Sequence, residues 1–295
     1  MILRSMLFIP GDSDKKLGKA DGSPADAIIV DLEDAVAAPR KEAGRQITQE
    51  FLKARPKASR KTKLYVRINP LESDAPLRDL AAISPGQPDG IMLPKCAGPE
   101  DVELISRYLD ILEMRDGAEA GSTKIVAITG ESAEGVLSLR DYAKWKGKLP
   151  RLVGMCWGPW DLAADIGAGG NKDPQGNYEL TYHMAMSMSL LGAKAAGLQA
   201  IDTAYTEFKD DAGLLAWCKR IRREGWTGKV AIHPAQVPII NDGFRPSPEE
   251  VAHAQRVADA FSNANDGVVS LDGVMLDLPH LKQARYILEL AKAAG

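Results

Sequence analysis

Two acidic residues at the ends of strand-like segments carry the clearest chemical signal in the sequence. Glu131 follows the apolar run KIVAITG, and Asp161 follows RLVGMCWGPW. Carboxylate oxygens are the ligands that Mg2+ prefers, and no cysteine or histidine cluster accompanies them to favour zinc. Each acid also adjoins a helix-like segment, where it could simply interact with the helix dipole. A site for Mg2+, with Mn2+ as an alternative ion, and a pair of helix-terminal acids therefore both stay open.

A second group consists of Arg67, in YVRINP, and the acids of IIVDLED. A guanidinium in a cleft can bind a carboxylate or stabilise a developing oxyanion. The alternative for Arg67 is an ion pair with Glu33 or Asp34 inside the fold. Asp31, Glu33 and Asp34 form an unusual acidic run on a buried strand, so at least one of them must be paired or face a cleft.

Lys95 and Cys156 also follow or lie in strand-like runs. Lys95, after GIMLP, could bind a phosphate or form a Schiff base, but a single lysine is a weak signal for either. Cys156 has no histidine near it in the sequence to activate it, so we expect a structural thiol.

The elements that must position these residues are eight strand-like runs that alternate with helix-like segments. The runs are RSMLFIPG, AIIVDLED, KLYVRINP, GIMLPK, KIVAITGE, RLVGMCWG, AIDTAY and KVAIHP. Most are continuously apolar, as strands are when both faces of a parallel sheet are buried. The alternation predicts an α/β fold, the TIM (β/α)8 barrel. An open doubly wound sheet is the alternative, but no GxGxxG motif follows the first strand.

Polar residues end nearly every predicted strand. In a TIM barrel the carboxyl ends of the strands meet at one face, where the active site is built. Strand ends also meet solvent, which explains any single polar residue, but the whole set favours a common cleft. Its members are Glu33, Asp34, Arg67, Asn69, Lys95, Glu131, Asp161, Asp202 and His233.

The sequence changes character after the predicted barrel at 1–241. The segment 242–295 contains two helix-like stretches joined by a short extended link. We expect it to form a carboxy-terminal helical extension that acts as a lid segment. Ser247 and Glu250 resemble a capping box, with Pro248 at the first helical position. The segment is too small for a core of its own, so we expect it to pack on the barrel or on a neighbouring subunit.

Composition argues against several classes of partner. The net charge is -3 over 295 residues and the acids and bases are interspersed, which gives little support to a nucleic-acid or membrane surface. The amino terminus lacks the pattern of a signal peptide. Cys96, Cys156 and Cys218 form no paired framework and indicate free thiols in a reducing cytoplasm. We therefore expect a cytoplasmic protein with a small-molecule ligand.

The motifs together resemble the citrate lyase beta subunit-like family of acyl-CoA lyases, which includes malyl-CoA and citramalyl-CoA lyases. The resemblance extends from about residue 4 to about residue 290. It implies a TIM barrel, Mg2+, a coenzyme A (CoA) thioester as substrate, a 2-keto acid as product and usually a homotrimer. The motifs that carry it are RSMLFIPG, IIVDLEDAV, YVRIN, IMLPK, GESAEGV, GPWDLAADIG, AIDTAYTEFKD, AIHPAQV and GVMLDLPHLKQAR.

The resemblance also assigns roles to residues in the barrel. Glu131 matches the first metal-binding carboxylate of the family, and Asp161 matches the second. Arg67 matches the arginine that holds the keto acid and the thioester oxygen. Glu33 and Asp34 match acids that hold metal-bound water.

Asp277, in VMLDLP, matches an acid that the carboxy-terminal segment presents to the active site of a neighbouring subunit. The implied reaction is a reversible Claisen-type cleavage of a 3-hydroxyacyl-CoA, such as citramalyl-CoA or malyl-CoA, to acetyl-CoA and pyruvate or glyoxylate. Asp277 would exchange the proton at the acetyl methyl carbon. Candidates for binding the CoA phosphates are Lys16, Lys19, Arg40 and Lys41.

One departure and two alternatives accompany the resemblance. The family usually has an apolar residue before the first metal carboxylate, where this chain has Gly130, so we expect a looser wall at the acid pocket. A related aldolase branch uses an early catalytic histidine, whereas the first histidine here is His183. The alternatives are the citryl-thioester lyase (beta) subunit of a citrate lyase complex, which yields oxaloacetate, and a non-catalytic binding or scaffold barrel.

Overall fold

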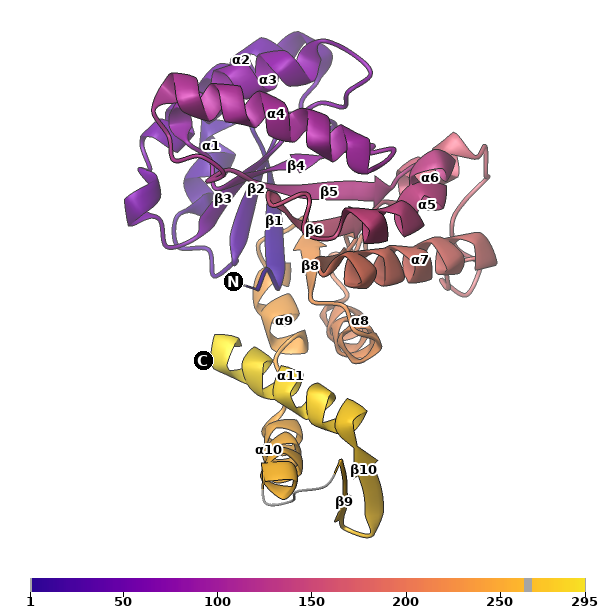
Figure 1. Cartoon of the computed structure of the whole chain (residues 1–295). Coiled ribbons are helices and arrows are strands. Elements are labelled where there is room, and N and C mark those ends of the chain that lie inside the picture. The colour runs from indigo at the N-terminus through magenta and orange to yellow at the C-terminus, as the bar shows by residue number, and fades with distance from the viewer. Residues whose placement is uncertain (1, 263–266, 295) are drawn as a thin grey trace.

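The computed structural model, which describes residues 2–262 and 267–294, contains a closed barrel of eight parallel strands (Figure 1). Pairing of β1 with both β2 and β8 closes the barrel. The predicted TIM barrel is therefore confirmed. The strands, in the order in which they neighbour each other, are β1 (Ser5–Pro10), β2 (Ala27–Asp31), β3 (Lys63–Arg67), β4 (Gly90–Leu93), β5 (Lys124–Gly130), β6 (Leu152–Trp157), β7 (Gln199–Asp202) and β8 (Gly228–Ala231).

Helices follow the strands and surround the barrel. Several have clear local signals: Ser132 caps α5 through a hydrogen bond that its Oγ accepts from Gly135 N at 3.0 Å, and Gly197 ends α7 with a positive φ that glycine tolerates. The helices are α1 (Asp14–Leu17), α2 (Lys41–Lys53), α3 (Ala75–Ile83), α4 (Pro99–Asp116), α5 (Ala133–Ser138), α6 (Pro159–Asp165), α7 (Leu180–Ala196), α8 (Asp211–Glu224) and α9 (Gln236–Gly243).

The strands carry two separate cores on their two faces. Side chains such as Ile29 and Tyr65 fill the barrel interior, while their neighbours Ile28 and Leu64 pack outward against the helices. Because both faces are buried, apolar residues run without interruption along each strand. The sequence could therefore locate the strands, but it could not show which face of each strand points inward.

The carboxy-terminal segment forms an extension with its own small core. It consists of α10 (Pro248–Ser262), a hairpin of β9 (Val268–Leu271) and β10 (Val274–Asp277), and α11 (Leu278–Ala294). The predicted capping box is present, because Ser247 N donates to Glu250 Oε2 at 2.7 Å and Glu250 N donates to Ser247 Oγ at 3.2 Å. The core residues of the extension are Ala254, Val257, Phe261, Leu276, Leu281 and Ala284.

The extension adjoins the amino-terminal ends of the barrel strands. Tyr286 of α11 lines a hollow together with Gln199 and Thr227, which lie at or just before the starts of β7 and β8. Arg222 of α8 pairs with Glu250 of α10 at 2.7 Å. Figure 1 shows the β9–β10 hairpin at the end of the extension that is farthest from the barrel. Among the described helices, none is long and apolar enough to cross a membrane.

Candidate active site

The mouth of the barrel contains an ion pair between Asp31, the last residue of β2, and Arg67, the last residue of β3. Ile29 and Tyr65 point into the barrel, and because strand side chains alternate, Asp31 and Arg67 point the same way. Arg67 Nε donates to Asp31 Oδ1 at 2.8 Å, and Nη2 donates to Oδ2 at 2.6 Å. The ion pair that the sequence left open for Arg67 therefore exists, with Asp31 as its principal partner.

Glu33 is the second carboxylate beside Arg67, with Oε2 lying 2.8 Å from Nη1. Asp31 also holds the turn that places Glu33, because Asp31 Oδ1 accepts from Glu33 N at 2.9 Å. Glu33 Oε2 is buried and no donor among the described residues aligns with it for a hydrogen bond. Burial raises the pKa of Glu33 against the opposing charge of Arg67. Burial also disfavours the charged guanidinium, but its pairs with Asp31 and Glu33 outweigh this and raise the pKa of Arg67.

Lys95, just after β4, connects the predicted acids of the site. Its backbone N donates to Glu131 Oε2 at 2.6 Å. Its Nζ donates to Glu33 Oε1 at 2.6 Å and lies 3.4 Å from Asp161 Oδ1. Asp34 Oδ2 is 4.0 Å from the same nitrogen. The structure thus brings Glu33, Asp34, Glu131 and Asp161 around Lys95, which the sequence placed in the common cleft without linking it to these acids.

The alternative interpretation, an acid at a helix amino terminus, applies to Asp161 but not to Glu131. Glu131 lies outside α5, which Ser132 caps, and it faces Lys95 instead. Asp161 lies in the first turn of α6, so the helix dipole favours its charge as well. Burial raises the pKa of Glu131 to about 8, and the negative charge of Asp161 contributes. Because burial disfavours the charged form of this carboxyl, a positive charge bound nearby would strongly stabilise that form.

The donors at the mouth fit a hard divalent cation. Mg2+ usually binds one or two protein carboxylates and completes its shell with water and substrate oxygens. Within the described ranges, no group of three or more His, Cys, Asp or Glu side chains is placed to hold a metal ion. In this network of contacts five acids face three bases, so a divalent cation would balance the two extra carboxylate charges once Glu131 is ionised. The acids are Asp31, Glu33, Asp34, Glu131 and Asp161, and the bases are Lys41, Arg67 and Lys95.

Gly130 does not border the acid pocket, so the expected loosening of the pocket wall is not observed. A Cβ atom at this position would lie 2.8 Å from Trp157 Cβ and 3.2 Å from Ser189 Oγ. Trp157 belongs to the core between barrel and helices and fills the space that a side chain at 130 would need. The close approach to the site is at Gly158, where a Cβ atom would lie 2.6 Å from Glu131 Cγ.

The basic residues expected to bind CoA phosphates do not lie together. Lys16 is exposed on α1, and Arg40 Nη2 donates to Asp12 O at 2.8 Å, beside the loop after β1. Lys19 is exposed but directly precedes Ala20, which lines a cavity at the amino-terminal ends of β2 and β3. Among the described residues, neither Lys16 nor Lys19 has a hydrogen bond or ion pair with the acids at the mouth, whereas Arg40 and Lys41 bond to the loops after β1 and β2.

Lys41 lies at the mouth, where its hydrogen bonds stabilise the backbone. Its Nζ donates to Leu32 O, Glu33 O and Asn69 Oδ1, each at 2.7 Å. These contacts use the three N–H bonds of the ammonium. Lys41 therefore holds the loop after β2 against the end of β3.

Asp202 is a strand-end acid that does not face the common cleft. Ile201 points into the barrel, so Asp202 points outward, towards the helices. Its carboxylate accepts from Trp157 Nε1 at 2.8 Å, from Trp217 Nε1 at 2.8 Å and from Lys229 Nζ at 2.6 Å. Its role is therefore in the packing of β7 and β8 against α8.

Asp277 ends β10, whose hairpin lies at the far end of the extension from the barrel (Figure 1), and the extension adjoins the amino-terminal ends of the strands, whereas Glu131 follows the carboxyl end of β5. Its side chain is exposed, and Oδ1 lies 2.5 Å from His280 Nδ1. Sequence reasoning did not pair these residues, although their spacing of three at a helix start permits it. Within one chain the structure does not bring Asp277 to the predicted metal site.

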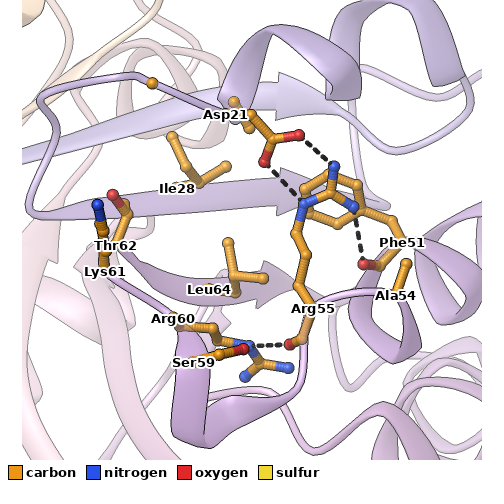
Figure 2. A pocket seen from close by; sticks show the side chains of 12 residues that line it. Asp21, Ile28, Phe51, Ala54, Arg55, Ser59, Arg60, Lys61, Thr62 and Leu64 are labelled. Carbon is orange, nitrogen blue, oxygen red and sulfur yellow. Dashed lines mark hydrogen bonds and ion pairs between the residues drawn. The ribbon is translucent and has the colours of Figure 1, made fainter.

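A separate cavity of about 290 Å³ lies between α2 and the amino-terminal ends of β2 and β3 (Figure 2). Arg55 and Asp21 form a two-point ion pair beside it, at 2.9 and 2.6 Å. Arg60 also lines it and donates to Asp89 Oδ2 at 3.1 Å. Because these arginines are already paired and the carboxylates lie at the other barrel end, this cavity is not the candidate active site.

Comparison with known proteins finds relatives that match nearly the whole chain. (3S)-Malyl-CoA thioesterase of Cereibacter sphaeroides is 35% identical over 293 residues, covering 98% of this chain and 95% of the relative. Citrate lyase subunit beta of Escherichia coli is 34% identical over 295 residues, covering 99% and 94%. Mitochondrial citramalyl-CoA lyase of Mus musculus is 33% identical over 298 residues, covering 98% and 86%.

A solved structure is similar over nearly the whole chain, extension included. The crystal structure of CitE from Mycobacterium tuberculosis in complex with magnesium, acetoacetate and coenzyme A aligns with a TM-score of 0.79 and 28% identity, covering 99% of this chain and 98% of that one. The family model described as HpcH/HpaI aldolase/citrate lyase matches residues 4–234. This chain belongs to the HpcH/HpaI aldolase/citrate lyase family.

Proposed function

We propose that this protein is a Mg2+-dependent carbon–carbon lyase that reversibly cleaves a 3-hydroxyacyl-CoA, such as citramalyl-CoA or malyl-CoA. The products would be acetyl-CoA and a 2-keto acid, pyruvate or glyoxylate. The observation that carries the proposal is the gathering of Glu131, Asp161 and Glu33 around Lys95, next to the guanidinium of Arg67. Relatives named as acting on malyl-CoA and citramalyl-CoA support the substrate class.

Glu131 and Asp161 would hold the cation, Mg2+ or Mn2+, and Glu33 and Asp34 would accept hydrogen bonds from its water. The excess of acids over bases at the mouth and the raised pKa of Glu131 support this assignment. When bound, the ion supplies Lewis-acid polarisation of the substrate's hydroxyl and carboxylate oxygens. The CitE complex with magnesium is consistent with such a site in a related protein.

Arg67 would stabilise the thioester enolate that carbon–carbon cleavage leaves behind. Of the five N–H bonds of its guanidinium, hydrogen bonds to Asp31 use one on Nε and one on Nη2. Hydrogens on Nη1 and Nη2 remain to contact the enolate oxygen, under the orientation that Asp31 imposes. Preorganised charge of this kind commonly lowers a barrier by ~3 kcal/mol or more.

Asp277 would move the proton at the acetyl methyl carbon, as a residue of a neighbouring chain. The β9–β10 hairpin that carries it lies away from its own barrel (Figure 1), which supports this arrangement, because a second copy could bring an Asp277 to the cleft. We accordingly propose a homotrimer in which each extension reaches an adjacent barrel. The three cysteines are free and buried, which supports a location in the reducing cytoplasm.

The product of a thioester assay tests the proposal. Purified protein with Mg2+ is incubated with malyl-CoA, citramalyl-CoA and citryl-CoA, and acetyl-CoA, keto acid and free CoA are quantified. Acetyl-CoA with glyoxylate or pyruvate is the expected result, and EDTA should abolish it. Free CoA with the intact hydroxy acid would show thioester hydrolysis instead, the activity in the name of the Cereibacter sphaeroides relative.

Two further outcomes separate the alternatives. Cleavage of the citryl thioester alone, to oxaloacetate, together with co-purifying partner subunits would favour a beta subunit of a citrate lyase complex, as in the Escherichia coli relative. Failure to bind Mg2+, oxaloacetate and pyruvate would favour a non-catalytic barrel. Wild-type rates for Asp277→Asn on all three thioesters would remove Asp277 from the mechanism.

A mixing experiment tests the shared site. Glu131→Gln and Asp277→Asn variants, each inactive, are dissociated and reassembled together. Activity should return, because a mixed assembly contains sites with an intact Glu131 from one chain and an intact Asp277 from another. Reassembly of each variant alone is the control. Mixed oligomers without recovered activity would contradict the proposed arrangement.

A further inference from the structure

Lys95 adopts a backbone conformation that is uncommon for a residue with a side chain. Its φ is +48°, in the left-handed region, which costs an L-residue roughly 1–2 kcal/mol relative to the right-handed form. Such strain persists only where surrounding contacts hold it. The adjoining amides provide these contacts: Lys95 N donates to Glu131 Oε2 at 2.6 Å, and Cys96 N donates to Ile128 O at 3.0 Å.

The ammonium of Lys95 is shared between acids with different exposure. Its contact with Glu33 is short, at 2.6 Å, and Glu33 is 2% exposed. The contact with Asp161 is longer, at 3.4 Å, and the Asp161 side chain is 33% exposed. The ammonium of Lys95 therefore binds Glu33 closely and Asp161 less closely. A metal cation can compete with the ammonium for Asp161.

We propose that Lys95 is a positioning residue that sets the affinity of the site for its divalent cation. Its backbone amide orients the Glu131 carboxylate, while its ammonium competes with the cation for Asp161. The inference rests on the proposed role of Glu131 and Asp161 as cation ligands. Because the ammonium also offsets the negative charges of Glu33 and Asp161, it stabilises the group of acids before the cation binds, at the expense of tighter binding.

Two substitutions remove the ammonium in different ways. Lys95→Met keeps the length of the apolar stem, whereas Lys95→Gly keeps the amide and relieves the left-handed strain. Lys95→Arg retains the charge. Lys41→Met is the matched control, because it removes one positive charge from the same end of the barrel, although Lys41 contacts neither Glu131 nor Asp161.

The measurement is the dissociation constant of Mg2+ alone, by titration calorimetry without substrate. We expect Lys95→Met and Lys95→Gly to bind Mg2+ about three- to tenfold more tightly than wild type, in proportion to the loss of one partly exposed ion pair. Lys95→Arg and Lys41→Met should stay near the wild-type value. Saturating Mg2+ should also raise the melting temperature of Lys95→Gly by more than that of wild type.

Failure of this inference differs from failure of the proposed function. Unchanged or weaker Mg2+ binding by Lys95→Gly, with wild type binding normally, would overturn the role of Lys95 alone. Wild-type protein that binds no Mg2+ would refute the cation site itself and the inference with it. If Lys95→Met does not fold, Lys95→Gly decides the outcome, since glycine adopts the required backbone without strain.

Discussion

Asp31 and Arg67 are register partners on adjacent strands and form a two-point ion pair inside the mouth of the barrel. This relationship fixes the plane of the guanidinium before any ligand arrives. It also means that the function of Arg67 depends on a residue that need not touch the substrate.

The dependence of Arg67 on Asp31 gives the first prediction. Asp31→Asn keeps the shape of the side chain but removes one buried charge, so Arg67 loses part of its orientation. We expect the free energy of unfolding to fall by roughly 1.5–3 kcal/mol, as for hydrogen bonds to charged groups. The kcat/KM for the acyl-CoA should fall at least about tenfold, whereas Arg67→Lys should reduce it about 100-fold or more. An Asp31→Asn enzyme with wild-type kcat/KM would show that Arg67 orients independently.

Gly158 and Gly130 form a matched pair for a second prediction. Gly158→Ala would place a Cβ 2.6 Å from Glu131 Cγ, and Gly130→Ala would place one 2.8 Å from Trp157 Cβ. Both substitutions overpack the protein and should cost roughly 1–3 kcal/mol of unfolding free energy. Only Gly158→Ala should weaken Mg2+ binding, because only it displaces Glu131. Equal losses of Mg2+ affinity in both variants, by titration calorimetry, would contradict this geometry.

The third prediction concerns acid stability and the pair of Glu113 and Arg151. Arg151 donates to Glu113 Oε1 at 2.7 Å and to Oε2 at 2.6 Å, and the amides of Gly121 and Thr123 also donate to this carboxylate. Burial acts to raise the pKa of Glu113, but these donors outweigh it and lower the pKa to about 2.

A folded-state pKa below the ordinary value gives stability that is present at neutral pH and lost as the pH falls from about 4.5 through about 2. Glu113→Gln should therefore be less stable than wild type by about 3 kcal/mol at pH 7. Urea unfolding at matched ionic strength should show the difference in unfolding free energy between the two proteins decreasing as the pH falls from about 4.5 to about 2. A gap that stays constant down to pH 2 would show that the charge of Glu113 does not contribute.

The basic residues give the fourth prediction. Lys16→Ala and Arg40→Ala should raise KM for the acyl-CoA about threefold to tenfold, as expected for exposed charges that attract phosphate, and the effect should weaken at high salt. Lys19→Ala is the control and should leave KM unchanged, because the next residue, Ala20, lines the cavity at the amino-terminal ends of β2 and β3. Lys41→Met should mainly lower the melting temperature. A large KM effect from Lys19 would place the CoA phosphates elsewhere than at the mouth.

Much of the fold could be predicted because each strand carries a continuous apolar run bounded by turn residues, and such runs alternate with helical segments eight times. Because the carboxyl ends of the strands of a TIM barrel meet at one face, Glu131, Asp161 and Arg67 could be placed there together. The resemblance to acyl-CoA lyases added Asp277 to the predicted site. The sequence pattern alone indicates only an exposed acid at this position.

The partners of these residues could not be predicted from the same patterns. When both faces of a strand are buried, the apolar run does not reveal which side chains point inward. Asp31 and Asp202 both end buried strands, yet Asp31 faces the mouth and Asp202 bonds to Trp217 and Lys229 on the outside. The strain at Lys95 was equally hidden, because its left-handed φ depends on contacts with β5 and with Glu131 just after it, and not on the residue itself.

The sequence by itself determined the number and order of the barrel strands and the chemical types at their ends, because burial selects local composition. Only the tertiary structure decided which of those groups meet. Register brought Asp31 beside Arg67, the positive φ of Lys95 joined it to Glu131, and packing at the amino-terminal end of the barrel kept Asp277 away from its own site. Each of these depends on contacts between residues distant in sequence, which local patterns do not encode.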